Sequence, residues 1–326
     1  MKAAIIGCGL IGGKRAKAFT GSIELCCDLN EGRAASLAKT YQARSTTDWQ
    51  AAVSDPAVDV VFVATTHDVL PVIAEAAAGQ GKHVLIEKPG ARRAIELDAV
   101  KAASARTGAR VHVGFNHRYH RAFRKAREIF ESGALGEMMF IRARYGHGGR
   151  VGYEKEWRAT PSLSGGGEGI DQGMHLVDLA RWFLGDFTDI AGHAATYFWK
   201  MPVDDNSFYL LRTATNQTAF LHASCTEWKN LFSFEIYGKH GKLDISGLGG
   251  SYGVERLTYY KMLPEMGPPE TTAFEYPMGD DSWEQEWVEF ETDIREGRDP
   301  KPGIEDAQAA LRAIEQVYRN SGMDKL

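Results

Sequence analysis

The segment GCGLIG at positions 7–12 has the spacing G-x-G-x-x-G and directly follows an apolar run, Ala3–Gly7, that is typical of a buried strand. In such a loop the first glycine permits a tight turn, the second lets the backbone approach a pyrophosphate, and the third allows close packing of helix on strand. Backbone N–H groups and the dipole at the start of the next helix favour an anion. We therefore predict that a dinucleotide binds at Gly7, Gly9, Leu10, Ile11 and Gly12.

Asp28 lies 21 residues after Gly7, at the end of the second predicted strand, Ile23–Asp28. A carboxylate there can accept both ribose hydroxyls of an adenosine and would repel a 2′-phosphate. The sequence therefore predicts NAD in preference to NADP. Arg33 and Lys14 keep NADP open, because either side chain could reach a phosphate.

Glu87-Lys88-Pro89 follows the predicted strand His83–Ile86, at the carboxyl end where open α/β sheets bind their ligands. A lysine cation there would stabilise the negative charge that develops on a carbinol oxygen as it loses its proton. Pro89 fixes the local backbone, although the sequence does not show whether its peptide bond is cis. By spacing alone, an exposed turn lysine is an equally good explanation.

Asp171 and His175 follow the glycine-rich loop Gly165–Gly167. They are four residues apart, so a helix that has begun by Asp171 would carry both side chains on one face. Imidazole, with a pKa of about 6.5, suits the transfer of a hydroxyl proton in either direction. Asp171 would orient that ring or bind a neighbouring hydroxyl. The alternative is a carboxylate at a helix N-terminus and a hydrogen-bonded interior histidine.

The first 115 or so residues must position the glycine loop and Lys88. They alternate short apolar runs with Ala-rich helical patterns such as Val69–Ala78 and Ala94–Arg106, as βαβ units around a parallel sheet do. The fold class is therefore α/β, with an N-terminal Rossmann doubly wound parallel sheet. The predicted strands are Ala3–Gly7, Ile23–Asp28, Val58–Ala64, His83–Ile86 and Arg110–Gly114.

The remaining chain has a different pattern. A basic helix at Ala122–Phe130, a strand at Met138–Tyr145 and a helix from about Asp171 to Leu184 precede several strands between Ala191 and Ser246, joined by short polar turns that favour antiparallel hairpins. Leu248–Pro277, rich in Gly and Pro, is predicted to be an extended loop. A helical apolar face recurs over Ile304–Tyr318.

Composition excludes several classes of protein. With 44% hydrophobic and 25% charged residues, the chain of 326 residues is typical of a globular protein of two domains rather than a disordered one. A net charge of -5 argues against general nucleic-acid binding. The four cysteines have no regular spacing and indicate free thiols in a reducing compartment. No apolar run reaches the ~18 residues of a membrane span, and glycines interrupt the N-terminal run, so we expect a cytoplasmic protein.

Together, and in this order, the glycine loop, Glu87-Lys88-Pro89, Gly114–Arg118 and the Gly-Gly-Gly…Asp171…His175 segment resemble the glucose–fructose oxidoreductase/inositol dehydrogenase (Gfo/Idh/MocA) family. The resemblance implies a Rossmann domain at 1–118 and an α/β domain at 119–326 with a large, mostly antiparallel open sheet. It also implies hydride transfer between a nicotinamide and a secondary or anomeric hydroxyl of a sugar, a sugar derivative such as a nucleotide sugar, or a cyclitol. The last helix, about 304–320, is expected to pack on the first domain.

The same resemblance implies roles for individual residues. Lys88, Asp171 and His175 match the family's catalytic positions and would also bind substrate, with His175 as acid/base. Residues expected to approach cofactor or substrate are Thr65, Glu87, Asn116, Trp157 and Arg158, and Tyr153 is a further candidate for stacking on a pyranose.

Two stretches depart from the family pattern. The usual Thr-Pro after the strand Val58–Ala64 is replaced at Thr66, and His67 stands in an unusual place, so the cofactor-binding lip there would have a different shape. Arg118 and Arg121 belong to a basic cluster, with His117, His120 and Arg124. That cluster would receive a substrate phosphate or carboxylate, or form a solvated helix face.

Alternatives to a simple dehydrogenase stay open. An NAD-dependent glycoside hydrolase would oxidise a sugar transiently and return the hydride, and a non-catalytic dinucleotide-binding protein would bind the cofactor without turnover. His117, His120 and His147 lack the Cys or carboxylate that would complete a metal site, so no metal is predicted. The partners expected are a small carbohydrate or cyclitol and further copies of the chain, in a dimer or tetramer. The expected interface is the exposed face of the C-terminal sheet, where apolar residues alternate at Phe208, Leu210, Phe232 and Phe234 and need covering.

Overall fold

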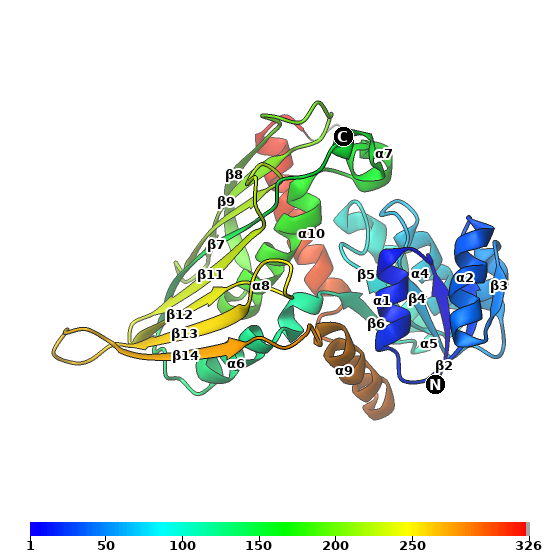
Figure 1. The fold of residues 1–326 in the computed structure, drawn as a ribbon, viewed down its shortest axis with the longest axis horizontal. Helices are drawn as coiled ribbons and strands as arrows, with labels where there is room; N and C mark the ends of the chain where they lie inside the picture. The colour runs from blue at the N-terminus through cyan, green and yellow to red at the C-terminus, as the bar shows by residue number, and fades with distance from the viewer. Residues whose placement is uncertain (324–326) are drawn as a thin grey trace. The chain divides into compact units, whose positions relative to one another are not determined.

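The structure is a computed structural model that describes residues 1–323, and these divide into two compact units (Figure 1). The first unit holds residues 1–115 and 283–309. Among the described residues, the second holds 116–282 and 310–323. Helix α10 (Ile304–Asn320) therefore gives its first residues to one unit and the rest to the other.

The first unit contains a six-stranded sheet of order β3-β2-β1-β4-β5-β6, in which every neighbouring pair is parallel. This confirms the predicted Rossmann sheet. The three-residue strand β3 was not predicted, because a short polar segment has no apolar signature. The strands are β1 (Lys2–Ile6), β2 (Ser22–Cys27), β3 (Arg44–Thr46), β4 (Val60–Val63), β5 (His83–Glu87) and β6 (Val111–Gly114).

Helices cover this sheet, and most residues of its strands other than β3 are buried between them. Strand β4 is buried at all four positions, as expected for a strand of a parallel sheet that is covered on both faces. Trp287 lies within 5.4 Å, ring centroid to ring centroid, of both Phe19 and Phe62. The helices of this unit are α1 (Leu10–Ala18), α2 (Glu31–Tyr41), α3 (Trp49–Ser54), α4 (Leu70–Gly79), η1 (Ala94–Leu97), α5 (Asp98–Thr107) and most of α9 (Ser282–Glu296).

The second unit contains an eight-stranded sheet of order β14-β13-β12-β11-β7-β10-β9-β8, which Figure 1 shows as a broad layer. Only the pair β7 and β10 is parallel, so the prediction of a large, mostly antiparallel sheet is confirmed. The strands are β7 (Met138–Gly146), β8 (Phe187–Ala195), β9 (Asn206–Thr213), β10 (Thr218–Ser224), β11 (Leu231–Gly238), β12 (Gly241–Ser246), β13 (Glu255–Lys261) and β14 (Glu270–Tyr276).

Helices pack on one face of this sheet. Phe123 of α6 lies edge-on to Phe232 and Phe234 of β11, and both strand residues are buried. The prediction that Phe232 and Phe234 belong to the exposed face is therefore wrong, because they alternate toward the helices. The helices and short turns of this unit are η2 (Asn116–Tyr119), α6 (Arg121–Glu131), η3 (Tyr153–Lys155), η4 (Trp157–Ala159), α7 (Pro161–Ser164), η5 (Gly169–Gly173) and α8 (Met174–Leu184).

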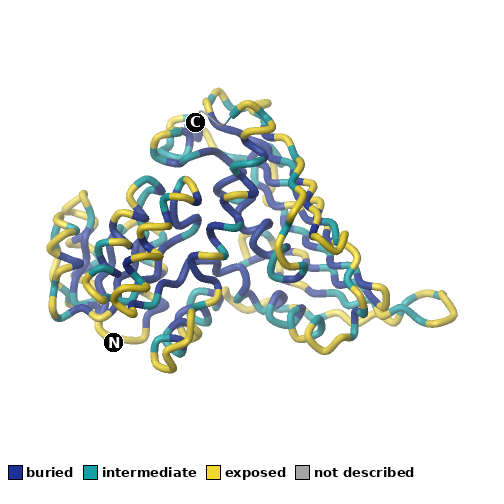
Figure 2. The backbone as a smooth tube through the Cα atoms, turned by 180° about the vertical axis from the view of Figure 1, so that it is seen from behind, coloured by how far each residue is buried: buried dark blue, intermediate teal, exposed yellow. Residues whose placement is uncertain are grey.

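The segment predicted as an extended loop, Leu248–Pro277, instead contains strands β13 and β14. They pair antiparallel from Glu255 with Tyr276 to Lys261 with Glu270. The hairpin tip between them extends beyond the sheet and contains exposed and half-buried residues but no buried one (Figure 2). Glycines and prolines gather mainly before β13 and in the tip, so composition averaged over the segment hid two regular strands.

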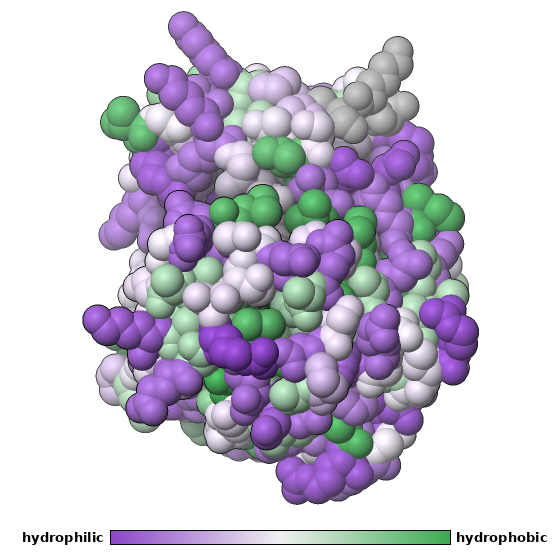
Figure 3. Space-filling model, turned by 90° about the vertical axis from the view of Figure 1, so that its right-hand side faces the viewer, coloured by the Kyte–Doolittle hydropathy of each residue, from purple (hydrophilic) through white to green (hydrophobic). Residues whose placement is uncertain are grey.

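Hydrophobic residues are scattered singly or in small groups among hydrophilic ones on the face drawn in Figure 3. Across residues 1–323, no helix has the length and apolar character needed to cross a membrane.

Candidate functional site

The glycine loop joins β1 to α1, and its three glycines have the three different environments that the spacing predicts. Gly7 has a φ of +94°, which disfavours any residue with a side chain. A Cβ on Gly12 would lie 1.8 Å from the carbonyl oxygen of Gly7, so only glycine permits this packing. A Cβ on Gly9 would meet nothing within 4 Å. Gly9 thus borders open space at the start of α1, as a pyrophosphate requires.

Asp28 follows β2 and faces the same loop. Its Oδ2 accepts a hydrogen bond from the backbone N–H of Cys8 at 2.8 Å, and its Oδ1 accepts one from the N–H of Asn30 at 2.8 Å. The carboxylate is only partly buried. The predicted adenosine-binding acid is therefore tied to the glycine loop by a direct hydrogen bond.

Lys88 follows β5, and its peptide bond to Pro89 is cis. The preceding residue, Glu87, is buried and accepts a 2.6 Å hydrogen bond from Nε of Arg15, which is 1% exposed. Burial raises the pKa of Glu87, and the charge of Arg15 opposes that rise. Strand β5 thus ends in a buried ion pair immediately before the half-buried Lys88.

Arg15 also binds Glu286 of α9, and Glu286 lies 3.2 Å from Nε2 of His112. Burial alone would raise the pKa of Glu286, but Arg15 and His112 outweigh it and lower the pKa. These residues carried no recognisable motif in the sequence, because their partners lie up to 271 positions apart. They form a buried network that fixes α1 and α9 to the end of β5.

Thr65, Thr66 and His67 follow β4. Thr66 donates a 2.6 Å hydrogen bond to Asp68, and His67 is buried. The backbone of Ala64 and Thr65 lies against Gly7, where a Cβ would come within 2.3 Å of the Ala64 carbonyl oxygen. The structure thus brings the start of this segment next to the glycine loop.

In the second unit, the glycine-rich loop is held by buried Asp204. Its carboxylate accepts hydrogen bonds from the N–H groups of Gly167 and Gly169, at 2.8 and 2.7 Å, and from the hydroxyl of Tyr318 at 2.7 Å. A Cβ on Gly167 would lie 1.9 Å from the Asp204 carbonyl oxygen. These glycines therefore serve close packing ahead of η5, and sequence reasoning missed Asp204.

Asp171 lies in η5, a turn of π-helix, and His175 lies in the first turn of α8. Both side chains are buried, with 6% and 3% exposure. Asp171 Oδ2 accepts a 2.8 Å hydrogen bond from Nε of Arg158, so the structure brings these two predicted residues together. The charge of Asp171 raises the pKa of Arg158.

The ring of His175 stacks on the ring of His117, with 3.6 Å between centroids and 17° between planes. His117 Nδ1 lies 3.2 Å from Asn116 Oδ1, and Asn116 donates a 3.0 Å hydrogen bond to Ser282. Asn116 and His175 are thus linked through His117, an arrangement that sequence reasoning did not identify.

Arg118 forms a bidentate ion pair with Asp178, at 2.8 and 2.6 Å, and is 6% exposed. The neighbouring basic residues also have acidic partners. His120 lies 3.1 Å from Glu255, while Arg121 and Arg124 both bind Asp281. The prediction of a solvated helix face is wrong for His117, Arg118 and His120, which are buried. The carboxylates around the cluster also weaken the alternative of a phosphate receptor.

Tyr153 donates a 2.7 Å hydrogen bond to Glu168, which is 1% exposed. Burial raises the pKa of Tyr153. His147 Nδ1 accepts from the N–H of Gly149, which leaves its Nε2 to donate to Glu168 at 3.3 Å. Trp157 is half-buried and lies 4.6 Å from the guanidinium of Arg158. Glu168 is a buried acid that no sequence motif indicated.

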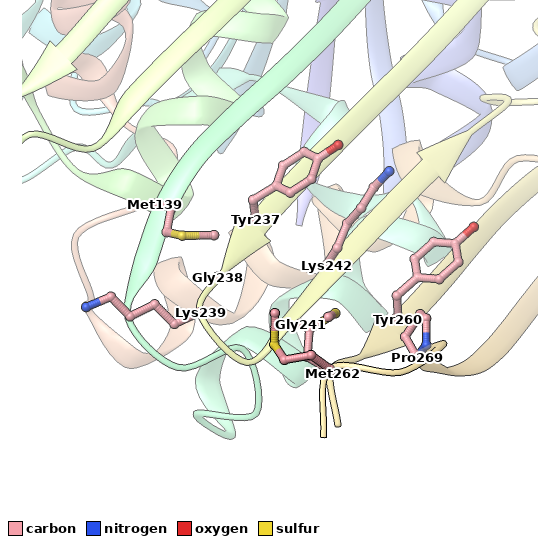
Figure 4. Close-up of a pocket in the computed structure, with 10 residues that line it drawn as sticks. Met139, Tyr237, Gly238, Lys239, Gly241, Lys242, Tyr260, Met262 and Pro269 are labelled. Atoms are coloured by element: carbon pink, nitrogen blue, oxygen red, sulfur yellow. The ribbon is translucent and has the colours of Figure 1, made fainter. Parts of the chain in front are cut away.

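Within residues 1–323, no group of three or more His, Cys, Asp and Glu side chains is arranged to hold a metal ion. A cavity of about 460 Å³ lies at one end of the second sheet (Figure 4). None of the predicted site residues lines it. Its walls are formed by Met139, Tyr237, Gly238, Lys239, Gly241, Lys242, Tyr260, Met262, Met266 and Pro269.

Comparison with protein families matches both units. The model described as an oxidoreductase family with an NAD-binding Rossmann fold matches residues 1–115, and that of the GFO/IDH/MocA C-terminal domain matches residues 123–244. The chain belongs to the GFO/IDH/MocA family. The predicted resemblance is thereby confirmed.

Three named dehydrogenases are similar to this chain over different lengths. Levoglucosan dehydrogenase of Pseudarthrobacter phenanthrenivorans is 29% identical over 61% of this chain and 58% of its own length. Inositol 2-dehydrogenase of Salmonella typhimurium is 25% identical over 57% of this chain and 55% of its own length. D-xylose dehydrogenase of Paenarthrobacter nicotinovorans is 25% identical over 88% of this chain and 81% of its own length. The chain thus spans little more than half the length of the first two relatives.

Two solved structures share the fold over nearly the full length of this chain. Levoglucosan dehydrogenase in complex with NADH and L-sorbose has a TM-score of 0.87 and 24% identity, covering 98% of this chain and 97% of that chain. GenD2 from gentamicin A biosynthesis, in complex with NAD, has a TM-score of 0.83 and 23% identity. The match covers 99% of this chain and 94% of that chain. At these identities the likeness shows the GFO/IDH/MocA fold.

Proposed function

We propose that this protein is an NAD-dependent dehydrogenase that acts on a secondary or anomeric hydroxyl of a sugar, a sugar derivative or a cyclitol. The observation that carries the proposal is the hydrogen bond from Cys8 N–H to Asp28, which fixes an acid beside a glycine loop of dinucleotide-binding geometry. Family membership and the sugar and cyclitol dehydrogenases among the relatives support the substrate class.

The residues of the first unit fit a dinucleotide. The N–H groups at the start of α1 and the open side of Gly9 would bind the pyrophosphate, and Asp28 would accept the ribose hydroxyls. Thr65, Thr66, His67 and Glu87 are proposed to line the cofactor site, and Asn116 is a further candidate cofactor contact. When bound, the nicotinamide supplies the acceptor or donor of a hydride.

The residues of the second unit are proposed to handle the substrate hydroxyl. His175 takes the hydroxyl proton in oxidation and returns it in reduction, while Asp171 binds a neighbouring hydroxyl. Lys88, which belongs to the first unit, is proposed to stabilise the negative charge on the reacting oxygen. Tyr153 and Trp157 are proposed to form part of the wall of the sugar site. Arg158 orients Asp171 through the hydrogen bond from its Nε. Arg118 is proposed to shape the site through its pair with Asp178.

The protein is further proposed to be cytoplasmic and homo-oligomeric through its C-terminal sheet. Leu210 and Phe220 are 51% and 49% exposed on the sheet face opposite the helices. They are direct neighbours across β9 and β10, so a second copy would cover both.

One experiment separates the function classes. Purified protein and NAD are incubated with free sugars, sugar acids, cyclitols, nucleotide sugars and aryl glycosides. A dehydrogenase produces reduced nicotinamide with one substrate class, whereas a glycoside hydrolase releases a phenol with no net change in the cofactor. Cofactor binding without either product would support a binding protein and would contradict the proposal.

A further inference from the structure

The rings of His117 and His175 form a face-to-face pair inside the second unit. Their centroids lie 3.6 Å apart, their planes differ by 17°, and the residues are 6% and 3% exposed. His117 comes from η2 and His175 from α8, so the contact joins two separate elements. The proposed mechanism uses His175 alone and assigns no role to the imidazole beneath it.

The hydrogen bonds of Asn116 define the proton position on His117. Asn116 Nδ2 donates to the hydroxyl of Ser282 at 3.0 Å, which directs its carbonyl oxygen toward His117 Nδ1, 3.2 Å away. A carbonyl oxygen only accepts hydrogen bonds, so His117 Nδ1 carries a proton. The ring is therefore held in one tautomer and one orientation.

The other neighbours of His117 favour its neutral form when His175 is charged. His120 meets it edge-on at 5.4 Å and is itself balanced by Glu255 at 3.1 Å and Asp280 at 3.6 Å. The rings of Tyr145 and Phe232 also lie near His117, at 5.3 and 6.3 Å between centroids. A second positive charge on His117 would lie between two other imidazoles, and like charges at that separation repel.

Charged groups near the pair lie on η2 and α8 themselves and on two further elements, η5 and η4. Arg118, the residue after His117, is neutralised by Asp178 of α8. Asp171 precedes His175 by four residues in η5 and is ion-paired with Arg158 of η4. The ring of His117 lies nearer to the His175 ring than the ring of Tyr145 does, at 3.6 Å against 6.3 Å between centroids.

We propose that His117 is a positioning residue for His175. It fixes the plane of the His175 ring and stabilises the imidazolium form through the face of a neutral imidazole. A cation over an aromatic face is attracted to its π electrons, and burial strengthens that attraction. The consequence for catalysis rests on the proposed function, since it requires His175 to carry the hydroxyl proton. The physical effect on His175 does not depend on any substrate.

The test measures the titration of His175 directly by NMR of the protein labelled with ring-13C histidine. His175→Gln assigns the resonance by its disappearance. His117→Phe keeps an aromatic face. His117→Leu and His117→Gln both remove it, the first with an apolar and the second with a polar side chain. In the Leu and Gln variants, His175 is expected to titrate about one pH unit lower than in the wild type, and in the Phe variant close to the wild-type value.

An unchanged His175 midpoint in the Leu and Gln variants would overturn the proposal, as would a Phe variant shifted as far as they are. Thermal unfolding shows which variants are folded, and the Gln variant replaces the Leu variant if the latter is not. With a substrate in hand, kcat should fall at least tenfold in the Leu and Gln variants with the KM for NAD unchanged. If no substrate is turned over, the proposed function fails, while the titration still decides the role of His117.

Discussion

The carboxylate of Asp28 accepts a 2.8 Å hydrogen bond from the backbone N–H of Cys8, which ties the acid at the end of β2 to the loop between β1 and α1. A second bond, from the N–H of Asn30, holds the other carboxylate oxygen at 2.8 Å. The orientation of the acid is therefore set by backbone groups before any ligand arrives.

Asp28→Ala is expected to weaken NAD binding about 10- to 100-fold, because buried ribose hydroxyls would lose a charged acceptor. NADP binding should weaken much less, since the repulsion of its 2′-phosphate is also lost. Direct titration of both cofactors checks this, with Asp28→Asn as the isosteric control. Binding of NADP to the wild type as tightly as NAD would contradict the assignment.

Gly9→Ala and Gly12→Ala are a matched pair within one loop. At Gly9 an added Cβ meets open space at a φ of -79°, so the fold should tolerate it while the pyrophosphate site is obstructed. At Gly12 the Cβ would collide with the backbone of Gly7 at 1.8 Å, so the free energy of unfolding should fall. Thermal unfolding and NAD titration distinguish the two effects. Equal loss of stability in both variants would show that Gly9 is required only for folding.

The sequence predicted most of the Rossmann sheet because its strands are nearly continuous apolar runs, as in Val60–Val63. Strands β13 and β14 were missed for the opposite reason. They form an edge hairpin with partly exposed residues, and the Gly- and Pro-rich stretches around them suggested a loop. Helix α9 was also missed, although Trp287 and Phe290 belong to the core of the first unit.

Arg158→Met should lower kcat/KM about 10- to 100-fold, because Asp171 loses the 2.8 Å ion pair that orients it. Arg158→Lys retains the charge without the guanidinium geometry and should lie between Met and wild type. NAD affinity serves as the control and should not change. An Arg158→Met enzyme with wild-type kcat/KM would exclude a role in positioning Asp171.

The carboxylate of Glu235 is predicted to make the stability of the second sheet depend on pH. Burial alone would raise the pKa of Glu235, but hydrogen bonds from Arg142, Lys242 and Tyr237 outweigh it and lower the pKa to about 2. A carboxyl whose pKa is lower in the folded state stabilises the protein above its unfolded pKa of about 4.3, and this contribution disappears as the pH falls toward the folded value. Glu235→Gln should therefore be less stable than the wild type at pH 7.

The stability difference should shrink between about pH 5 and pH 2, as the wild-type carboxyl becomes protonated. Thermal midpoints of both proteins across this range provide the measurement. A difference that stays constant with pH would mean that the charge of Glu235 contributes nothing to stability.

The outer face of the second sheet provides a test of assembly. Leu210→Asp and Phe220→Asp, alone or together, should shift the protein to smaller species in size-exclusion chromatography with light scattering, because each buries a charge in the proposed interface. Val151→Asp, at an exposed position outside that sheet face, is the control. Wild-type protein that is monomeric at high concentration would contradict the proposed oligomer.

The candidate site could be predicted only where its residues are grouped in short motifs. The glycine loop, Lys88 and the Asp171–His175 pair are local patterns in the sequence. Arg158 was predicted only because the chain resembles the family. The partners of these residues come from distant positions, as with Arg15 and Glu286, and only the fold brings them together. His117 was assigned to a basic cluster, because sequence spacing does not reveal which ring will stack on His175.

The most direct test of the account measures the formation of reduced nicotinamide by the wild type, His175→Ala and Lys88→Ala with NAD and a panel of sugars, sugar derivatives and cyclitols. We expect turnover of one substrate class by the wild type, and a loss of about 10²- to 10⁴-fold in the His175 variant while NAD still binds. The Lys88 variant should also lose activity, because the developing oxyanion loses its cation. Turnover that survives removal of His175, or no turnover in either direction despite NAD binding, would contradict it.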